Sequence, residues 1–359
     1  MKVQVRHETR YDYVPPVEVA QHMAYLRPRN TTNQQLLAHT LEVEPRPAQQ
    51  SVAQDVYGNT RTFLSLQIAH ARLRVVATSV VSTRVREMPA SEMPWEQVRE
   101  HFRYRADGAY DAAAEFVFAS PYAPRHPDFA SYARPSFASG VGLYAAAADL
   151  MHRIHTDFVY ESQSTHVNTP APEALAQRKG VCQDFAHIMI ACLRSMGLAA
   201  RYVSGYLLTT PAPGTERLVG NDASHAWVSV LLPDLPPDAR WCDFDPTNDR
   251  CGWGTPGEDY VVLATGRDYV DVSPIRGVIH GGASHRLRVG VTVTPLEPDA
   301  TGLPRAPDPP QVGTQSQGQG QSQSQSQSQS QSQSQSQNQN QNQNRNDIEP
   351  VPGESLPGQ

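Results

Sequence analysis

Apolar and polar residues alternate through most of the first 83 positions of the chain, a pattern typical of strands with one buried face. The alternating runs cover residues 2–11, 17–26, 36–44, 61–69 and 71–83. Turn-forming residues separate them, among them Pro15-Pro16 and Gly58-Asn59. Several short strands at this spacing predict an antiparallel sandwich or barrel. We therefore expect an all-β, sandwich-like N-terminal domain over residues 1–88.

A helical period replaces the alternation further along the chain. Residues 89–140 show no clear period, and we interpret them as an irregular connection that is helical in part, over 95–104. Apolar residues then recur at helical spacing over 143–158 and again over 185–196. Gly197 stands where a glycine would end the second helix.

Strand-like runs return after the second helix, at residues 199–209, 226–232, 241–245 and 260–265. A helix followed by several such strands predicts an α+β domain, which we place over residues 141–298. A late strand over 285–296 is included in it, although this strand could instead return to the N-terminal domain. Residues 299–359 are dominated by Gln, Ser and Asn and carry too few apolar residues to fold, so we expect a disordered tail.

The composition of the chain excludes several classes of partner and cofactor. The formal net charge is −6 and no long basic block occurs, so we expect no nucleic-acid partner. No apolar run of about 18 residues and no apolar N-terminal leader occur, so we expect no membrane partner and a cytoplasmic location. The four cysteines form no CxxC pair, and Cys242 and Cys251 lack two further regularly spaced ligands. We therefore expect reduced thiols, no metal and no cofactor.

One of the four cysteines is placed for chemistry. Cys182 follows Gly180 and opens the second helix, where the positive end of the helix dipole favours a thiolate. His225 stands just before the strand 226–232, and Asp245 ends the strand 241–245. If these two strands are antiparallel neighbours, they supply a base for the thiol and an acceptor that orients the base. Cys192 lies on the apolar face of the same helix, where a core role is expected.

The stretches that hold these residues resemble the transglutaminase-like superfamily. They read GVCQDFAHIMIACLRSMGLAARYVSGY, ASHAWVSV and FDPTN, and GRDYVDVSPIRGVIHGG at 266–282 is similar as well. The resemblance is strongest to a bacterial branch whose members carry a β-rich N-terminal region. It implies a papain-like core, with the cysteine helix packed on an antiparallel sheet, and a catalytic triad of Cys182, His225 and Asp245.

The resemblance implies a cysteine hydrolase that cleaves a peptide, isopeptide or side-chain amide bond of a peptide or protein substrate through a thioester. Two alternatives stay open: a protein-glutamine acyltransferase with an amine acceptor, and a non-catalytic scaffold or binding protein of the same fold. The backbone N–H of Cys182 is the expected oxyanion donor. The second donor is not identified, and Gln177 is a loose candidate for it. Candidate substrate contacts are Trp227, Gln183 and His166. The oligomeric state is not predicted.

Overall fold

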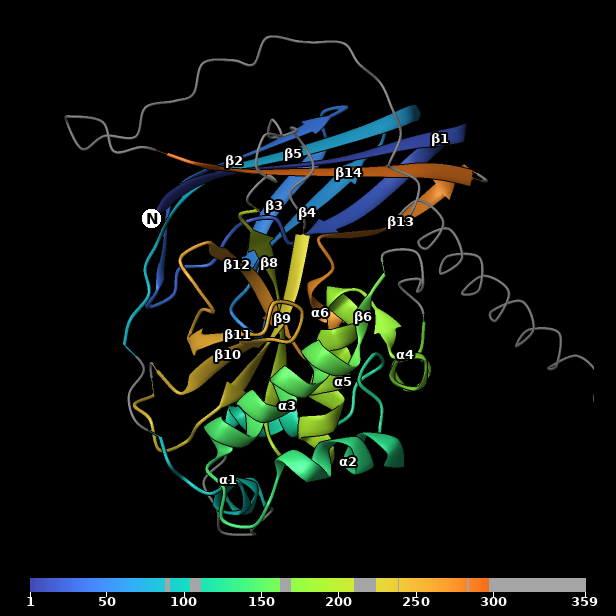
Figure 1. Ribbon diagram of the computed structural model, residues 1–359. Coiled ribbons are helices and arrows are strands. Elements are labelled where there is room, and N and C mark those ends of the chain that lie inside the picture. Colours follow the sequence, from blue (N-terminus) through green and yellow to red (C-terminus); the bar gives the residue numbers. More distant parts are fainter. Residues whose placement is uncertain are drawn as a thin grey trace, which may run out of the picture.

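The computed structural model describes residues 1–87, 91–103, 111–161, 169–209, 224–237, 239–282 and 284–296. Within these ranges a large β-sheet, the N-terminal sheet, lies over a second sheet with its helices (Figure 1). We call the second sheet the core sheet. The tail predicted over 299–359 lies outside the described residues.

The N-terminal sheet has seven strands. These are β1 (Lys2–Ala24), β2 (Gln34–Glu44), β3 (Gln49–Gln54), β4 (Thr60–Leu66), β5 (His70–Thr83), β13 (Ile275–Gly281) and β14 (Ser284–Pro295). Their order is β2-β5-β1-β4-β3, and β13 and β14 also pair with β1. The prediction from the sequence missed β3, whose residues are all exposed and therefore show no apolar alternation.

The long strand β1 runs through the whole of this one sheet. Its first half pairs with β5 and β14, and its second half pairs with β4 and β13. The predicted turn at Pro15-Pro16 is wrong, because the strand continues through these residues with only a shift in register between Asp12 and Val17. Apolar side chains from β1, β4 and β5, such as Tyr11, Leu64 and Leu73, form one core. The β-rich N-terminal region is thus confirmed.

The core sheet is antiparallel, with the order β11-β10-β9-β8-β12. Its strands are β8 (Ala200–Leu207), β9 (Ser224–Leu231), β10 (Trp241–Asp245), β11 (Arg250–Trp253) and β12 (Tyr260–Gly266). The helical elements are α1 (Trp95–His101), η1 (Ala112–Val117), α2 (Pro127–Ala133), η2 (Arg134–Ser136), α3 (Leu143–Asp157), α4 (Ala171–Gln177), α5 (Cys182–Ser195) and α6 (Tyr269–Val272). Two short strands, β6 (Val159–Tyr160) and β7 (Lys179–Gly180), form a separate parallel pair.

Helix α5 is the central helix of this half of the molecule. It packs on β8 and β9, and α2, α3 and α4 pack around it (Figure 1). Every residue from Asp184 to Arg194 is therefore buried, on all sides of the helix. Gly197 ends it at φ = 81°, a left-handed conformation that glycine adopts at no steric cost. The predicted papain-like α+β core is confirmed by this arrangement, and the connection 89–140 contributes α2 to it.

The last described strand, β14, belongs to the N-terminal sheet and packs against the core sheet. The predicted strand 285–296 forms β14, but it pairs with β1 in the N-terminal sheet, so its assignment to the α+β core was wrong. A half-buried amphipathic strand shows which face is apolar but not which strand it pairs with. The apolar face of β14 contributes Val291 and Val293 to a core shared with Tyr206 of β8 and Val261 of β12.

Polar contacts also join the two sheets. The side chain of Gln34 on β2 bridges the backbone of Val262 on β12: Oε1 accepts from its N–H at 2.7 Å, and Nε2 donates to its carbonyl oxygen at 2.8 Å. The imidazole of His7 on β1 is hydrogen-bonded to the hydroxyl of Tyr206 on β8 at 3.0 Å. The N-terminal sheet is thereby fastened to both β8 and β12.

We expect Gln34→Ala to lower the free energy of unfolding by about 1–3 kcal/mol, because it leaves the N–H of Val262 buried without its partner and removes one of the two hydrogen bonds to its carbonyl oxygen, which Arg29 also donates to. Urea denaturation measures the difference. The control is Gln35→Ala, the neighbouring residue on the same strand, whose side chain is exposed. Equal effects of the two substitutions would contradict this account of the junction.

Candidate active site

Cys182 is held at the first position of α5 by the segment that leads into the helix. The carboxylate of Asp184 accepts a hydrogen bond at 2.9 Å from the N–H of Val181 and so caps the helix. A Cβ on Gly180 would lie 2.7 Å from that carboxylate, so only glycine leaves room for the cap. The thiol of Cys182 is partly exposed, and its backbone N–H belongs to the first turn, where no intrahelical acceptor exists.

His225 and Asp245 come from adjacent antiparallel strands of the core sheet, β9 and β10. His225 Nε2–H donates to Asp245 Oδ2 at 2.7 Å, and both side chains are almost completely buried, with exposed fractions of 5% and 0%. Cys182 lies near enough to this imidazole to raise its pKa. Because Nε2 is bonded to Asp245, Nδ1 is the ring nitrogen left for the thiol.

Further donors converge on the carboxylate of Asp245. Asn248 Nδ2 and the hydroxyl of Tyr260 each donate to Oδ2 at 2.7 Å, and the N–H of Thr247 donates to Oδ1 at 2.9 Å. Burial alone would raise the pKa of Asp245. The hydrogen bond and charge of His225, with the bonds from Asn248 and Tyr260, outweigh burial and lower it. Asp245 is therefore an anion.

The pKa of His225 is set by the same competition. Burial lowers it, but the hydrogen bonds to Asp245 and Cys182 and their negative charges outweigh burial and raise it well above the ordinary value for imidazole. A raised pKa keeps His225 protonated at neutral pH. The imidazolium therefore places a positive charge near Cys182.

Trp227 packs against the imidazole of His225. Its ring stacks on that of His225 at a centroid distance of 6.0 Å, and its Nε1–H donates to Asp243 Oδ2 at 3.0 Å. Gly205 pairs with His225 across β8 and β9, and a Cβ on Gly205 would lie 2.5 Å from the indole. Trp227 is completely buried and packs against His225, so the substrate contact considered for it from the sequence stays a prediction.

The structure thus brings Cys182, His225 and Asp245 together. Gln183 follows Cys182 in the first turn of α5 and is partly exposed. The amide of Gln177 donates a hydrogen bond to the carboxylate of Glu173 on the same helix, at 2.9 Å. His166 lies outside the described residues.

Two residues of the site were missed from the sequence. Asn248 lies three positions after Asp245, close enough for a local side-chain contact to be suspected from the FDPTN stretch. Tyr260 lies 15 positions away from Asp245, on β12 at the opposite edge of β8, and no local pattern marks its hydroxyl. Tyr260 reaches Asp245 because of the order of the strands in the core sheet.

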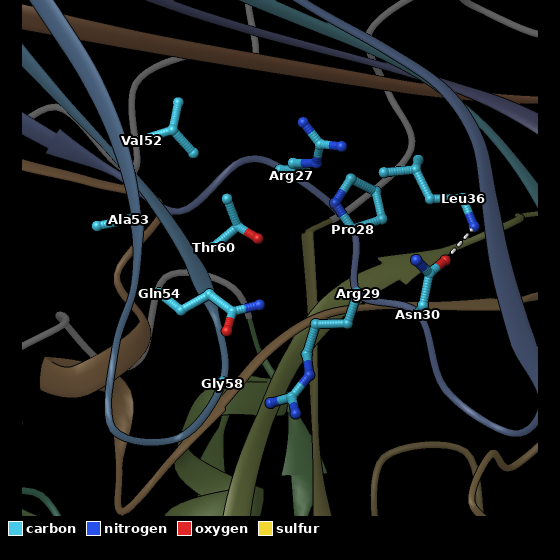
Figure 2. A pocket seen from close by; sticks show the side chains of 10 residues that line it. All are labelled: Arg27, Pro28, Arg29, Asn30, Leu36, Val52, Ala53, Gln54, Gly58 and Thr60. Carbon is cyan, nitrogen blue, oxygen red and sulfur yellow. Dashed lines mark hydrogen bonds between the residues drawn. The ribbon is translucent and has the colours of Figure 1, made fainter.

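Other features of the molecule lie apart from this cluster. A cavity of about 490 Å³ opens beside Arg27, Arg29 and the strand β3, and none of its lining residues belongs to the cluster (Figure 2). Within the described ranges, no group of three or more His, Cys, Asp or Glu side chains is arranged to hold a metal ion. None of the helices in those ranges has the length and apolarity needed to cross a membrane.

A partly exposed cysteine at a helix start, beside an imidazole and a carboxylate on a sheet, is an arrangement found in the papain-like fold. Residues 3–82 match the model of the bacterial transglutaminase-like N-terminal region, and residues 130–246 match that of the transglutaminase-like superfamily. The chain belongs to the transglutaminase-like superfamily.

Its relatives include an uncharacterized protein of Mycobacterium tuberculosis, 39% identical over 306 residues, which cover 83% of this chain and 94% of the relative. An uncharacterized protein of Mycobacterium leprae is 32% identical over 300 residues, 82% of this chain and 99% of the relative. The crystal structure of a putative cysteine protease from Cytophaga hutchinsonii is similar in fold, with a TM-score of 0.62 at 21% identity over 86% of this chain and 94% of that one.

We expect Asp245→Asn to lower the pKa of His225, because the substitution removes the negative charge that stabilises the imidazolium. Titration of the imidazole by NMR measures the shift. Asp249→Asn is the control, since Asp249 pairs with His152 at 2.8 Å and not with His225. An unchanged His225 titration in Asp245→Asn would show that the charge of Asp245 does not set this pKa.

Proposed function

We propose that the protein is a cysteine-nucleophile hydrolase that cleaves an amide bond of a peptide or protein through a thioester. The observation that carries the proposal is the 2.7 Å hydrogen bond between His225 and the buried Asp245, with Cys182 near enough to the same imidazole to raise its pKa. Cys182, His225 and Asp245 are the proposed catalytic residues. The fold of a protein described as a putative cysteine protease gives independent support.

The proposed reaction has two halves. The thiolate of Cys182 attacks the carbonyl carbon, and the backbone N–H of Cys182 donates a hydrogen bond to the resulting oxyanion. The C–N bond breaks, His225 transfers its proton to the leaving nitrogen, and a thioester remains. Water then attacks the thioester, His225 takes the proton of the water, and the acid leaves as the thiolate forms again. Asp245 keeps the imidazole oriented in both halves.

We expect iodoacetamide at pH 6 to alkylate Cys182 at least about tenfold faster than Cys251, because the imidazolium of His225 favours the thiolate. Cys251 is also partly exposed and serves as an internal reference, while burial raises the pKa of Cys192 and Cys242. Mass spectrometry assigns the alkylated sites. His225→Ala should abolish the selectivity.

The control is His152→Ala, which removes an exposed histidine that pairs with Asp249. Equal alkylation of Cys182 and Cys251 in the wild-type protein would overturn the proposal and favour a non-catalytic binding protein.

We expect amidase activity on peptide amides to fall at least about 10³-fold in Cys182→Ala and in His225→Ala. The assay measures amine release with and without an added primary amine. Products that contain only the free acid support hydrolysis. Incorporation of the added amine at the expense of the acid would identify the protein as an acyltransferase instead.

A further inference from the structure

The short strand β6 runs beside the segment that delivers Cys182. It pairs in parallel with β7, with Tyr160 opposite Gly180, and the chain goes from Gly180 through Val181 into Cys182. In the described part of the chain, β7 is the one strand that pairs with β6. Figure 1 shows β6 beside α5, below the N-terminal sheet. One edge of β6 therefore pairs with β7, which leads into the cysteine helix, and no strand of the described residues pairs with the other, open edge.

The hydrogen bonds of β6 show which of its backbone groups face outward. The N–H of Val159 donates to the carbonyl of Arg178, and the N–H of Glu161 donates to the carbonyl of Gly180, both at 2.9 Å. Backbone groups of successive residues in a strand point to opposite edges. The N–H and the carbonyl of Tyr160 therefore point away from β7, in the geometry that a further strand would pair with.

The side chain of Tyr160 packs against the start of α5. Its ring meets that of Phe185, in the first turn of α5, edge-on at a centroid distance of 6.3 Å. Partial burial, followed by the negative charges of Cys182 and Asp184, raises the pKa of Tyr160 to about 12. Even so, 54% of Tyr160 is exposed, and so is 58% of Val159. Two large side chains are thus left in contact with solvent beside the segment that leads into Cys182.

We propose that the open edge of β6 is the substrate-docking edge, where an extended polypeptide segment pairs with the backbone of Tyr160 and places its scissile carbonyl at Cys182. The inference rests on the proposed function and names its substrate class. Strand addition satisfies the outward N–H and carbonyl of Tyr160, which a helix cannot do because its own backbone groups are already paired. In this arrangement the ring of Tyr160 and the side chain of Val159 contact the side chains of the substrate residues on either side of the one that pairs with Tyr160.

Two substitutions separate the backbone from the ring of Tyr160. Tyr160→Pro removes the outward N–H but none of the β6–β7 hydrogen bonds, which use the N–H groups of Val159 and Glu161. Tyr160→Ala, the matched control, removes the ring and keeps the N–H. Each variant is treated with a peptidyl chloromethyl ketone, which must dock as a peptide, and with iodoacetamide, which needs only a reactive thiol. Circular dichroism and thermal unfolding check that both variants are folded.

We expect the second-order rate of Cys182 with the peptidyl probe to fall about 10- to 100-fold in Tyr160→Pro, and less in Tyr160→Ala, with the iodoacetamide rate unchanged in both. A second measurement leaves the protein untouched: peptidyl probes in which an ester oxygen replaces one amide N–H at a time. One position should lose a similar factor with the wild-type protein, because its N–H bonds to the carbonyl of Tyr160.

The outcomes distinguish the two proposals. If Cys182 in the wild-type protein reacts with iodoacetamide no faster than Cys251, the proposed function has failed. If Cys182 reacts with both probes, but neither Tyr160→Pro nor any ester replacement slows the peptidyl probe, the docking edge is wrong and the cysteine nucleophile stands. If Tyr160→Pro proves unfolded, the ester series alone decides, by the same criterion.

Discussion

The site depends on keeping the carboxylate of Asp245 charged inside the protein. Removing a carboxylate from water costs several kcal/mol unless hydrogen bonds and an opposite charge compensate. Here the compensation comes from three places: His225 on β9, the turn after β10 with Thr247 and Asn248, and Tyr260 on β12. These groups meet only if the order of the core sheet is correct. The electrostatics that raise the pKa of His225 are therefore a consequence of strand order.

The N-terminal sheet takes part in this arrangement, although none of its side chains belongs to the cluster around Cys182. It holds β12 through Gln34 and β8 through His7, at Val262 and Tyr206 respectively. Val262 lies two residues after Tyr260, and Tyr206 follows Gly205, which makes room for Trp227. Movement of the N-terminal sheet would displace the strands behind the imidazole and its carboxylate. This coupling gives a physical reason for one chain to carry both regions.

The sequence was sufficient where structure is local or periodic. The apolar face of α5, the glycine that ends it, and the strands that carry His225 and Asp245 all follow from spacing. Prediction from the sequence failed where the pairing of strands decides the structure. The exposed strand β3 has no alternation, β14 has alternation but no mark of its partner, and Tyr260 reaches Asp245 only through the order of the sheet. A fully buried Trp227 and one that contacts substrate also look the same in sequence.

The thiol is held as firmly as the imidazole, because α5 is fixed at both ends. At its start Asp184 accepts from Val181, and near its end the guanidinium of Arg194 donates to the carbonyls of Phe116, Ala200 and Arg267. The signs of both charges match the helix dipole, negative at the N-terminus and positive at the C-terminus. A helix that is buried on every side and fastened at both ends cannot carry its first residue toward a ligand. Under the proposed function, the substrate is therefore brought to Cys182 by the exposed surface around the helix start.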